Sequence, residues 1–237
     1  MDGRQLPYPD GDASLVGELY EPSTPNGASV LVFHEADGIG GNVRRRCAML
    51  AELGYRAFAA DLHGAGRPLE GAEMQRAVAL LRDHPERFRR RARAGLEALL
   101  ALPGVDPSRI AAIGYCLGGM AALELARSRA HIAAAVSFHG LLRTRAPAAP
   151  GAVAAKVAVF TGARDPLVPA GDIAAFQGEM AAAAVDWQLT VYGQAWHAFT
   201  IAGVEDLGDA RMRYDPVADR LSWAAALALI EEAVGPR

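Results

Sequence analysis

The sequence predicts an α/β protein with a mostly parallel central sheet and helices on both faces. Short apolar runs recur along the chain, and from the second run onward they alternate with amphipathic, helix-like segments. Such alternation of strand and helix is typical of parallel sheets that are covered on both sides. With 237 residues, of which 51% are hydrophobic, the chain can form one continuous core, so we expect a single domain over 1–237. The predicted strands lie in 14–20, 29–34, 55–62, 109–115, 132–139, 157–162 and 187–193.

Three further elements follow from local patterns. The run "SLVGELY" at 14–20 lies between the turn-rich stretches "PDGD" and "EPSTPNG", which predicts an antiparallel edge strand. In the segment 73–100, arginines surround a seam of leucine and alanine, which indicates a helix with a solvated face. Asn42 is the expected N-cap of the helix that follows the glycine-rich stretch at 37–42.

Charge and composition exclude several classes of partner. There are 24 basic and 27 acidic residues, and the net charge of −3 favours neither nucleic acid nor an anionic membrane. The uncharged stretch at 221–230 is about half of the roughly 20 residues that span a bilayer. The first residues lack the basic and apolar pattern of a secretory signal, and two cysteines form no disulfide framework. We therefore expect a cytoplasmic protein with reduced thiols, and the scarcity of lysine favours a bacterial, GC-rich genome.

One cysteine lies where a nucleophile is expected. In "AAIGYCLGGM", Cys116 lies between glycines, directly after an apolar run and before a helix-like segment. The pattern Gly114-x-Cys116-x-Gly118 matches the sharp strand-to-helix turn that presents a nucleophile above a sheet. The helix N-terminus behind the turn stabilises a thiolate. A small residue among glycines would also suit tight packing of a strand against a helix. The motif therefore indicates a nucleophile only if an acid and a histidine accompany it.

The partners appear in the expected chain order. In this architecture an acid follows a later strand and a histidine follows the next one. Asp165 in "VAVFTGARDPLVP" and His197 in "LTVYGQAWHAFT" each follow a predicted strand. An aspartate before proline can be a simple turn residue, and a single histidine can be structural. Residue type, order and strand-end position together favour a Cys-His-Asp triad.

Four stretches together resemble the dienelactone hydrolase family of α/β-hydrolases: "VFHEADGIGG", "GYCLGG", "ARDPLVP" and "HAF". The similarity extends from about residue 10 to the C-terminal helix. The resemblance implies the α/β-hydrolase fold, a triad of Cys116, His197 and Asp165, and hydrolysis of small esters or lactones. It also implies that Glu35 in "HEADG" hydrogen-bonds the resting thiol and assists its deprotonation. A helix-capping or loop carboxylate is the structural alternative for Glu35.

General chemistry supports these roles. A thiol is mostly protonated at neutral pH, and a histidine oriented by a carboxylate supplies the base and later protonates the leaving group. Backbone N–H groups should bind the developing oxyanion. The expected donors are Leu117, one residue past the nucleophile, and Ala36 in the loop after an early strand.

No motif calls for a cofactor or a metal. The remaining histidines have no paired metal-ligand spacing. The glycines at 37–42 do not match the dinucleotide pattern, and the single lysine, Lys156, rules out a phosphate loop. We expect a small-molecule ester or lactone as the partner, with the chain a monomer or weak homodimer.

The chain departs from the family at its substrate-binding position. The resemblance implies that arginines clamp the substrate carboxylate, one of them four residues beyond the catalytic histidine. That position is Ile201, which offers no donor for a carboxylate. No motif aligns the second arginine, and Arg67 and Arg76 are candidates from the right region.

Two other functions compete with an ester hydrolase. A cysteine amidotransferase resembles this pattern but requires a late His-Pro-Glu, whereas "HPE" here is at 84–86, before the cysteine. A redox sensor or ligand-binding protein would use Cys116 as a reactive thiol without turnover. The presence of Asp165 and His197 argues against that second function.

Overall fold

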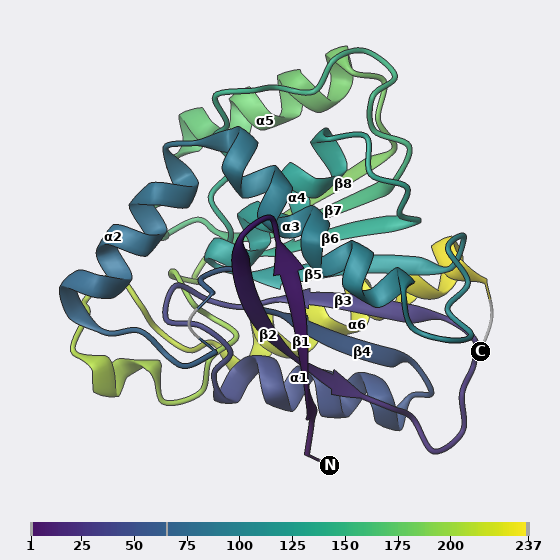
Figure 1. Ribbon diagram of the computed structural model, residues 1–237. Helices are drawn as coiled ribbons and strands as arrows, with labels where there is room; N and C mark the ends of the chain where they lie inside the picture. The colour runs from purple at the N-terminus through teal and green to yellow at the C-terminus, as the bar shows by residue number, and fades with distance from the viewer. Residues whose placement is uncertain (1, 65, 236–237) are drawn as a thin grey trace.

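The computed structural model describes residues 2–64 and 66–235, and within them eight strands form one sheet (Figure 1). The strand order is β1-β2-β4-β3-β5-β6-β7-β8. The six strands from β4 to β8 in this order are parallel, and only β1 and β2 run antiparallel to their neighbours. This confirms the predicted α/β class. The strands are β1 Arg4–Asp10, β2 Ala13–Tyr20, β3 Ser29–Phe33, β4 Arg56–Ala60, β5 Ile110–Tyr115, β6 Ala134–Phe138, β7 Lys156–Gly162 and β8 Trp187–Tyr192.

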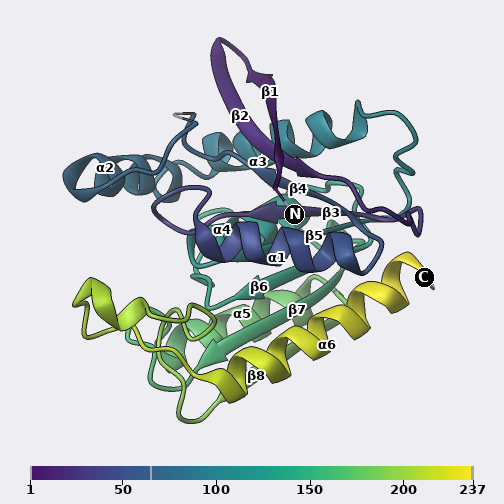
Figure 2. The same cartoon turned by 90° about the horizontal axis from the view of Figure 1, so that it is seen from below.

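Helices cover both faces of the sheet, as Figures 1 and 2 show. On one face, α3, α4 and α5 pack against the sheet, and on the other face α1 and α6 do so. Among the described residues, none of the helices combines the length and apolar composition that a bilayer span needs. The helices are α1 Gly41–Glu52, α2 Gly71–Arg82, α3 Pro85–Leu100, α4 Leu117–Arg127, α5 Ala170–Ala182, α6 Pro216–Val234 and the short 3-10 helix η1 Val204–Leu207.

The apolar runs of the sequence become strands because both faces of the central sheet are buried. All residues of β3, β5 and β6 are buried. Alternate residues of β3 point into opposite cores: Leu31 and Phe33 face α3 and α4, whereas Val30 and Val32 face α1. A strand buried on both faces needs a continuous apolar sequence, which is the pattern that predicted it.

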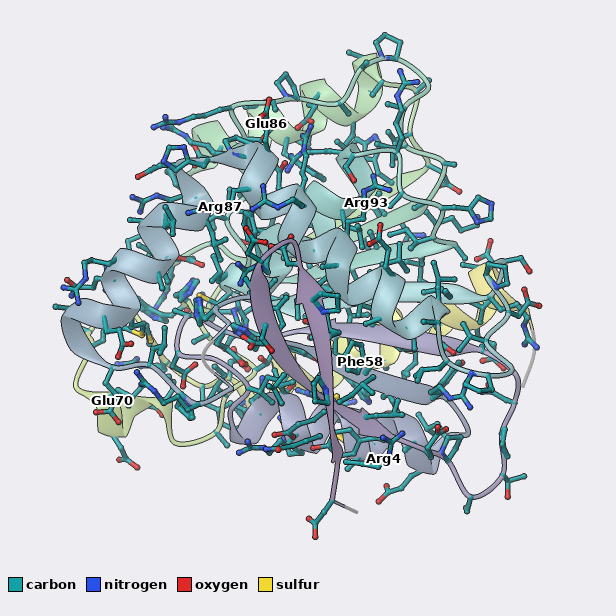
Figure 3. The ribbon with its side chains drawn as sticks, viewed as in Figure 1. Arg4, Phe58, Glu70, Glu86, Arg87 and Arg93 are labelled. Atoms are coloured by element: carbon teal, nitrogen blue, oxygen red, sulfur yellow. The ribbon has the colours of Figure 1, made fainter. Side chains whose placement is uncertain are left out.

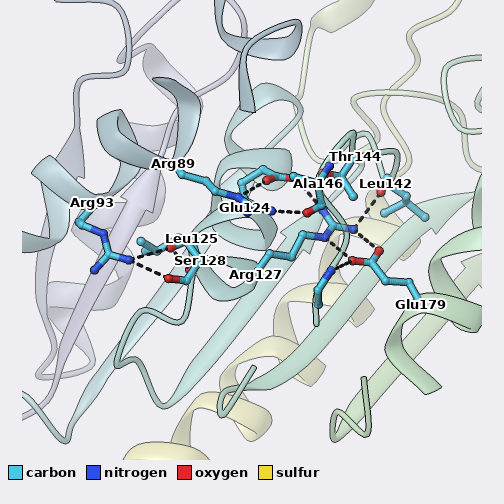
Figure 4. A network of polar contacts seen from close by, with 11 residues as sticks. Arg89, Arg93, Glu124, Leu125, Arg127, Ser128, Leu142, Thr144, Ala146 and Glu179 are labelled. Carbon is cyan, nitrogen blue, oxygen red and sulfur yellow. Dashed lines mark hydrogen bonds and ion pairs between the residues drawn. The ribbon is translucent and has the colours of Figure 1, made fainter. Parts of the chain in front are cut away.

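Buried charges fasten α4 to the elements around it (Figure 4). Glu124 is fully buried and accepts hydrogen bonds from Arg89 of α3 and from Arg127, at 2.8 and 3.0 Å. Arg127 in turn binds Glu179 of α5 and donates to the carbonyl of Leu142. Because each of these buried charges has an opposite partner, the network holds α4 in place without leaving an uncompensated charge.

The structure corrects the prediction at the edge of the sheet. β2 is antiparallel as expected, but it is not the edge strand, because β1 pairs along its outer side. Two prolines, Pro7 and Pro9, alternate with buried Tyr8 and Asp10 in β1. Proline removes backbone donors and is tolerated on an edge strand, which is why the apolar pattern alone missed this element.

The segment 73–100 forms two helices rather than one. The break lies between α2 and α3, where Pro85 occupies the first turn of α3 and His84 is its N-cap. The expected solvated face is present in part. Glu86 and Arg87 lie exposed on α3 (Figure 3), but Arg91 is 11% exposed and is paired with Asp10.

Candidate active site

Four of the predicted residues lie at the carboxyl edge of the parallel strands. Cys116 directly follows β5, Asp165 follows β7, and His197 follows β8. Glu35 lies just beyond the end of β3. Because parallel strands end at one edge of a sheet, residues far apart in the sequence meet there, in the usual position of α/β ligand sites.

Cys116 occupies a sharp turn between β5 and α4. Its backbone angles are φ 54° and ψ −114°, which residues with a side chain rarely adopt. A Cβ atom at Gly114 would lie 2.0 Å from the carbonyl oxygen of Gly118, and one at Gly118 would lie 2.2 Å from the carbonyl oxygen of Phe33. The two glycines are therefore required by the close approach of β5, α4 and β3.

Hydrogen bonds join the thiol, an imidazole and a carboxylate in a line. His197 Nε2 lies 3.2 Å from Cys116 Sγ, and His197 Nδ1 lies 2.8 Å from Asp165 Oδ2. The other carboxylate oxygen of Asp165 accepts the N–H of Leu167 at 2.8 Å. His197 and Asp165 are buried, whereas Cys116 is partly exposed. The arrangement can move a proton between the thiol and the imidazole while the carboxylate orients the ring.

The protonation of His197 depends on the groups at its two ring nitrogens. Burial alone would lower the pKa of His197, but the Cys116 thiolate and the hydrogen bond to Asp165 together raise it to about 10. Negative groups therefore face both nitrogens and stabilise the imidazolium.

Glu35 is buried just beyond the end of β3, and its side chain hydrogen-bonds Asn42 rather than Cys116. Asn42 Nδ2 of α1 donates to Glu35 Oε1 at 2.6 Å, whereas the hydrogen bond of Cys116 Sγ is to His197. Asn42 is not the N-cap of α1, because Gly40 holds that position. Burial raises the pKa of Glu35 to about 7, against the opposing effect of the Asn42 hydrogen bond.

Two neutral histidines fix the loop that contains Glu35. His34 Nδ1 donates to the carbonyl of Glu35 at 2.6 Å, and its Nε2 accepts the N–H of Leu62 at 2.9 Å. His63 Nε2 donates to the carbonyl of Ala36 at 2.8 Å. These histidines serve as hydrogen-bonding groups. In the part of the chain that the structure describes, no three His, Cys, Asp or Glu side chains form a group suited to a metal ion.

The two expected oxyanion donors come from adjoining segments. Leu117 is the first residue of α4, where a helix offers its N–H no partner of its own. Ala36 follows Glu35 in the loop after β3. The contact between Gly118 and the carbonyl of Phe33 brings the start of α4 against the end of β3. This places the two backbone segments side by side next to Cys116.

The three substrate-binding candidates, Ile201, Arg67 and Arg76, lie in different surroundings. Ile201 is half-buried in a turn after His197, and its N–H donates to the carbonyl of Ala198 at 3.0 Å. Arg67 is paired with Glu73 at 2.7 Å, and its side chain is 57% exposed. Arg76 is exposed on α2.

Sequence reasoning missed His139, which contacts the triad, and Thr200, which hydrogen-bonds His139. His139, which follows β6, is fully buried, and its ring packs edge-on against the His197 ring at 5.3 Å between centroids. Thr200 binds the other side of the His139 ring, with Oγ1 2.8 Å from Nε2. The available signal was the position of His139 at the end of a predicted strand. It was passed over because it has no partner close in sequence.

The raised pKa of Glu35 predicts a pH-dependent stability. Below about pH 4.5 the carboxyl is protonated in both states, and between about pH 4.5 and about pH 7 the folded state binds more protons. The free energy of unfolding therefore falls as pH rises through this window, by about 3 kcal/mol in total. Urea unfolding across this range should show Glu35→Gln gaining stability relative to the native protein as pH rises. Equal pH dependence in both would contradict the buried carboxyl, and Glu21→Gln, at an exposed position, is the control.

Comparison with known proteins places the chain in one family. The model of the dienelactone hydrolase family matches residues 15–234. The solved structure named m3DLH is 42% identical, covers 98% of both chains and has a TM-score of 0.93. A dienelactone hydrolase-like promiscuous phosphotriesterase, P91, from metagenomic libraries is 37% identical, covers 98% of both chains and has a TM-score of 0.92.

A curated protein is also similar to this chain in sequence. A protein of Bradyrhizobium sp. named "Probable 2-oxo-3-(5-oxofuran-2-ylidene)propanoate lactonase" is 30% identical over 207 residues, which cover 82% of this chain and 79% of the relative. The match to the family model extends over all the strand ends that carry Glu35, Cys116, Asp165 and His197. The chain belongs to the dienelactone hydrolase family and has the α/β-hydrolase fold.

Proposed function

We propose that the protein hydrolyses small neutral esters or lactones, with Cys116 as the nucleophile, His197 as the base and acid, and Asp165 as the group that orients His197. The observation that carries the proposal is the line of hydrogen bonds from Cys116 Sγ to His197 Nε2, at 3.2 Å, and from His197 Nδ1 to Asp165, at 2.8 Å. Membership of the family supports hydrolysis of carboxylic esters or lactones.

The reaction proceeds in two steps through a thioester. The Cys116 thiolate attacks the carbonyl carbon, the bond to the alkoxide breaks, and the Nε2 proton of His197 passes to the leaving oxygen. A water molecule then attacks the thioester, His197 accepts its proton, and the carbon–sulfur bond breaks. The products are the acid and the alcohol, and a lactone yields both groups in one molecule.

Backbone N–H groups of Leu117 and Ala36 stabilise the negative oxygen of each tetrahedral intermediate. Leu117 begins α4, so its free N–H points out of the helix start, where the helix dipole also favours negative charge. Hydrogen bonds from His34 and His63 hold the carbonyls of Glu35 and of Ala36 itself. Pre-oriented donors of this kind supply the largest single contribution in many acyl transfers.

Assistance from Glu35 to the thiol remains part of the proposal rather than of the observed contacts. Its carboxyl hydrogen-bonds to Asn42, and a pKa of about 7 leaves both protonation states populated near neutrality. A buried group of this kind can exchange a proton at the pH of the reaction. The alternative of a redox sensor without turnover leaves His197 and Asp165 without a role.

The preference for neutral substrates rests on two of the candidate substrate-binding positions, 201 and 67. Ile201 holds the position at which the family resemblance implies an arginine, and it offers no charged donor. Arg67, a candidate replacement, is already paired with Glu73. A substrate carboxylate would therefore gain little from this pair of positions.

Loss of the nucleophile or base should remove activity. With p-nitrophenyl acetate, we expect Cys116→Ala to abolish turnover and His197→Ala to lower kcat roughly 10⁴-fold or more, because such groups act as a unit. Cys116→Ser should also be poor, since a hydroxyl is a much weaker acid than a thiol. Cys47→Ala, which changes the other cysteine, a buried one, is the matched control and should retain activity. Near-native rates in Cys116→Ala or His197→Ala would refute the proposed triad.

Restoring a cation should change the substrate preference. A charged hydrogen bond is worth about 1.5–3 kcal/mol, so Ile201→Arg should raise kcat/KM for cis-dienelactone roughly ten- to a hundredfold relative to a neutral ester of similar size. Ile201→Met, which keeps an apolar side chain, should leave the ratio unchanged. A strong native preference for the dienelactone would instead show that another cation, such as Arg67 or Arg76, binds the carboxylate.

A further inference from the structure

His139 lies directly behind the nucleophile and has two defined ring contacts. The N–H of Cys116 lies 3.2 Å from His139 Nδ1 and also 3.0 Å from the carbonyl oxygen of Phe138. On the other side of the ring, Nε2 lies 2.8 Å from Thr200 Oγ1. His139 is fully buried and has a positive φ of 41°, so its backbone is strained next to that of Cys116.

These contacts determine where the ring carries its proton. A backbone N–H can only donate, so His139 Nδ1 must accept the hydrogen bond from Cys116. The proton of the neutral ring is therefore on Nε2, which donates it to Thr200 Oγ1. A protonated ring, or the other tautomer, would direct an N–H at the N–H of Cys116.

The surroundings keep this ring neutral while its neighbour becomes charged. Burial lowers the pKa of His139 well below its ordinary value, and the nearby positive groups, His197 and Arg46, lower it further. The His139 ring also packs edge-on against Phe199 at 5.3 Å between centroids. A second cation here would oppose the imidazolium that His197 forms.

Thr200 is itself held in place from α1. Arg45 Nη2 donates to the carbonyl of Thr200 at 3.2 Å and to Asn42 Oδ1 at 2.8 Å, and Asn42 donates to Glu35. A continuous set of hydrogen bonds thus runs from Glu35 to Thr200, and His139 extends it to the backbone of the nucleophile. The side chains of Asn42 and Arg45 thus connect the loop after β3 to the segment around Thr200, and they take no part in the proposed reaction.

We propose that His139, held by Thr200 as the neutral tautomer with its proton on Nε2, is a positioning residue that fixes the strained main chain of Cys116 for attack. The proposal rests on the proposed function, because it assigns His139 a role through the Cys116 nucleophile. It applies to the acylation step, in which the direction of Sγ and of the Leu117 N–H is decided by the Cys116 backbone.

Substitution of Thr200 tests the proposal without touching the triad. Thr200→Val has almost the same shape but leaves Nε2–H without an acceptor, so the ring no longer holds the required tautomer. A misplacement of about 1 Å can cost roughly 100-fold, and we expect kcat to fall roughly 10- to 100-fold with KM nearly unchanged. Thr200→Ser keeps the hydroxyl and should restore most of the rate. The control is Thr161→Val, since the buried Thr161 Oγ1 has no hydrogen-bond partner among the described residues.

The outcomes separate this proposal from the proposed function. Native rates in Thr200→Val, with Cys116→Ala inactive, would overturn the role of His139 alone. An active Cys116→Ala would overturn the proposed function. If kcat of Thr200→Val falls only in proportion to its folded fraction, with KM unchanged, and Thr200→Ser does not rescue it, the role is merely structural and the proposal is wrong.

A measurement on the native protein is independent of folding defects in variants. Imidazole ¹⁵N spectra distinguish protonated from unprotonated ring nitrogens, and assignment by comparison with His139→Phe identifies the resonances of His139. We expect Nδ1 without a proton and Nε2 with one, unchanged between about pH 5 and about pH 8, where an ordinary histidine titrates. A proton on Nδ1, or titration of the His139 ring in this range, would overturn the proposal.

Discussion

The strained turn at Cys116 is the constraint on which the rest of the site depends. A residue with a side chain adopts φ 54° only where its surroundings enforce it, and here β5, α4 and β3 approach so closely that Gly114 and Gly118 cannot carry a Cβ atom. The N–H of Cys116 donates to the carbonyl of Phe138, the last residue of β6, and to Nδ1 of His139, the next residue. The buried charges around Glu124 then fasten α4 to its neighbours (Figure 4). The sheet supplies the stability that keeps this turn in place.

Two adjacent histidines at the carboxyl edge of the sheet, His197 and His139, have pKa values shifted in opposite directions. His197 faces a thiolate and a carboxylate, and its pKa is raised. His139 faces a backbone N–H, a hydroxyl and two positive groups, and its pKa is lowered. The rings lie 5.3 Å apart, so one can carry the catalytic proton while the other stays neutral. The two residues are of the same type, so their different neighbours explain why His197 carries a proton and His139 stays neutral.

Much of the fold could be predicted because its signals are local. The central strands are buried on both faces and therefore consist of consecutive apolar residues. The glycines around Cys116 indicate the sharp turn directly. The β1 strand was missed because Pro7 and Pro9 obscure its pattern. The break between α2 and α3 does have a local signal in Pro85, which the prediction of one helix over 73–100 did not use. Local signals do not report which strand pairs at the edge of a sheet.

Partners that are distant in the sequence explain most of the site that was not predicted. His139 gains its role from Thr200, 61 residues further along the chain, and Asn42 binds Glu35 instead of capping α1. No spacing rule reports such contacts. The single domain, the cytoplasmic location and the monomer or weak homodimer stay predictions. The catalytic assignments of Cys116, His197 and Asp165 also stay proposals, on geometry that brings the three side chains together.

Trapping the covalent intermediate shows whether Cys116 is the nucleophile. The native protein is mixed rapidly with p-nitrophenyl acetate, quenched in acid within the first turnover, digested and mapped by mass spectrometry. We expect one acetyl group on the peptide that contains Cys116, formed at the rate of the p-nitrophenol burst and lost as turnover continues. An acetyl group on another residue, or turnover with Cys116 never acylated, would show that Cys116 is not the nucleophile.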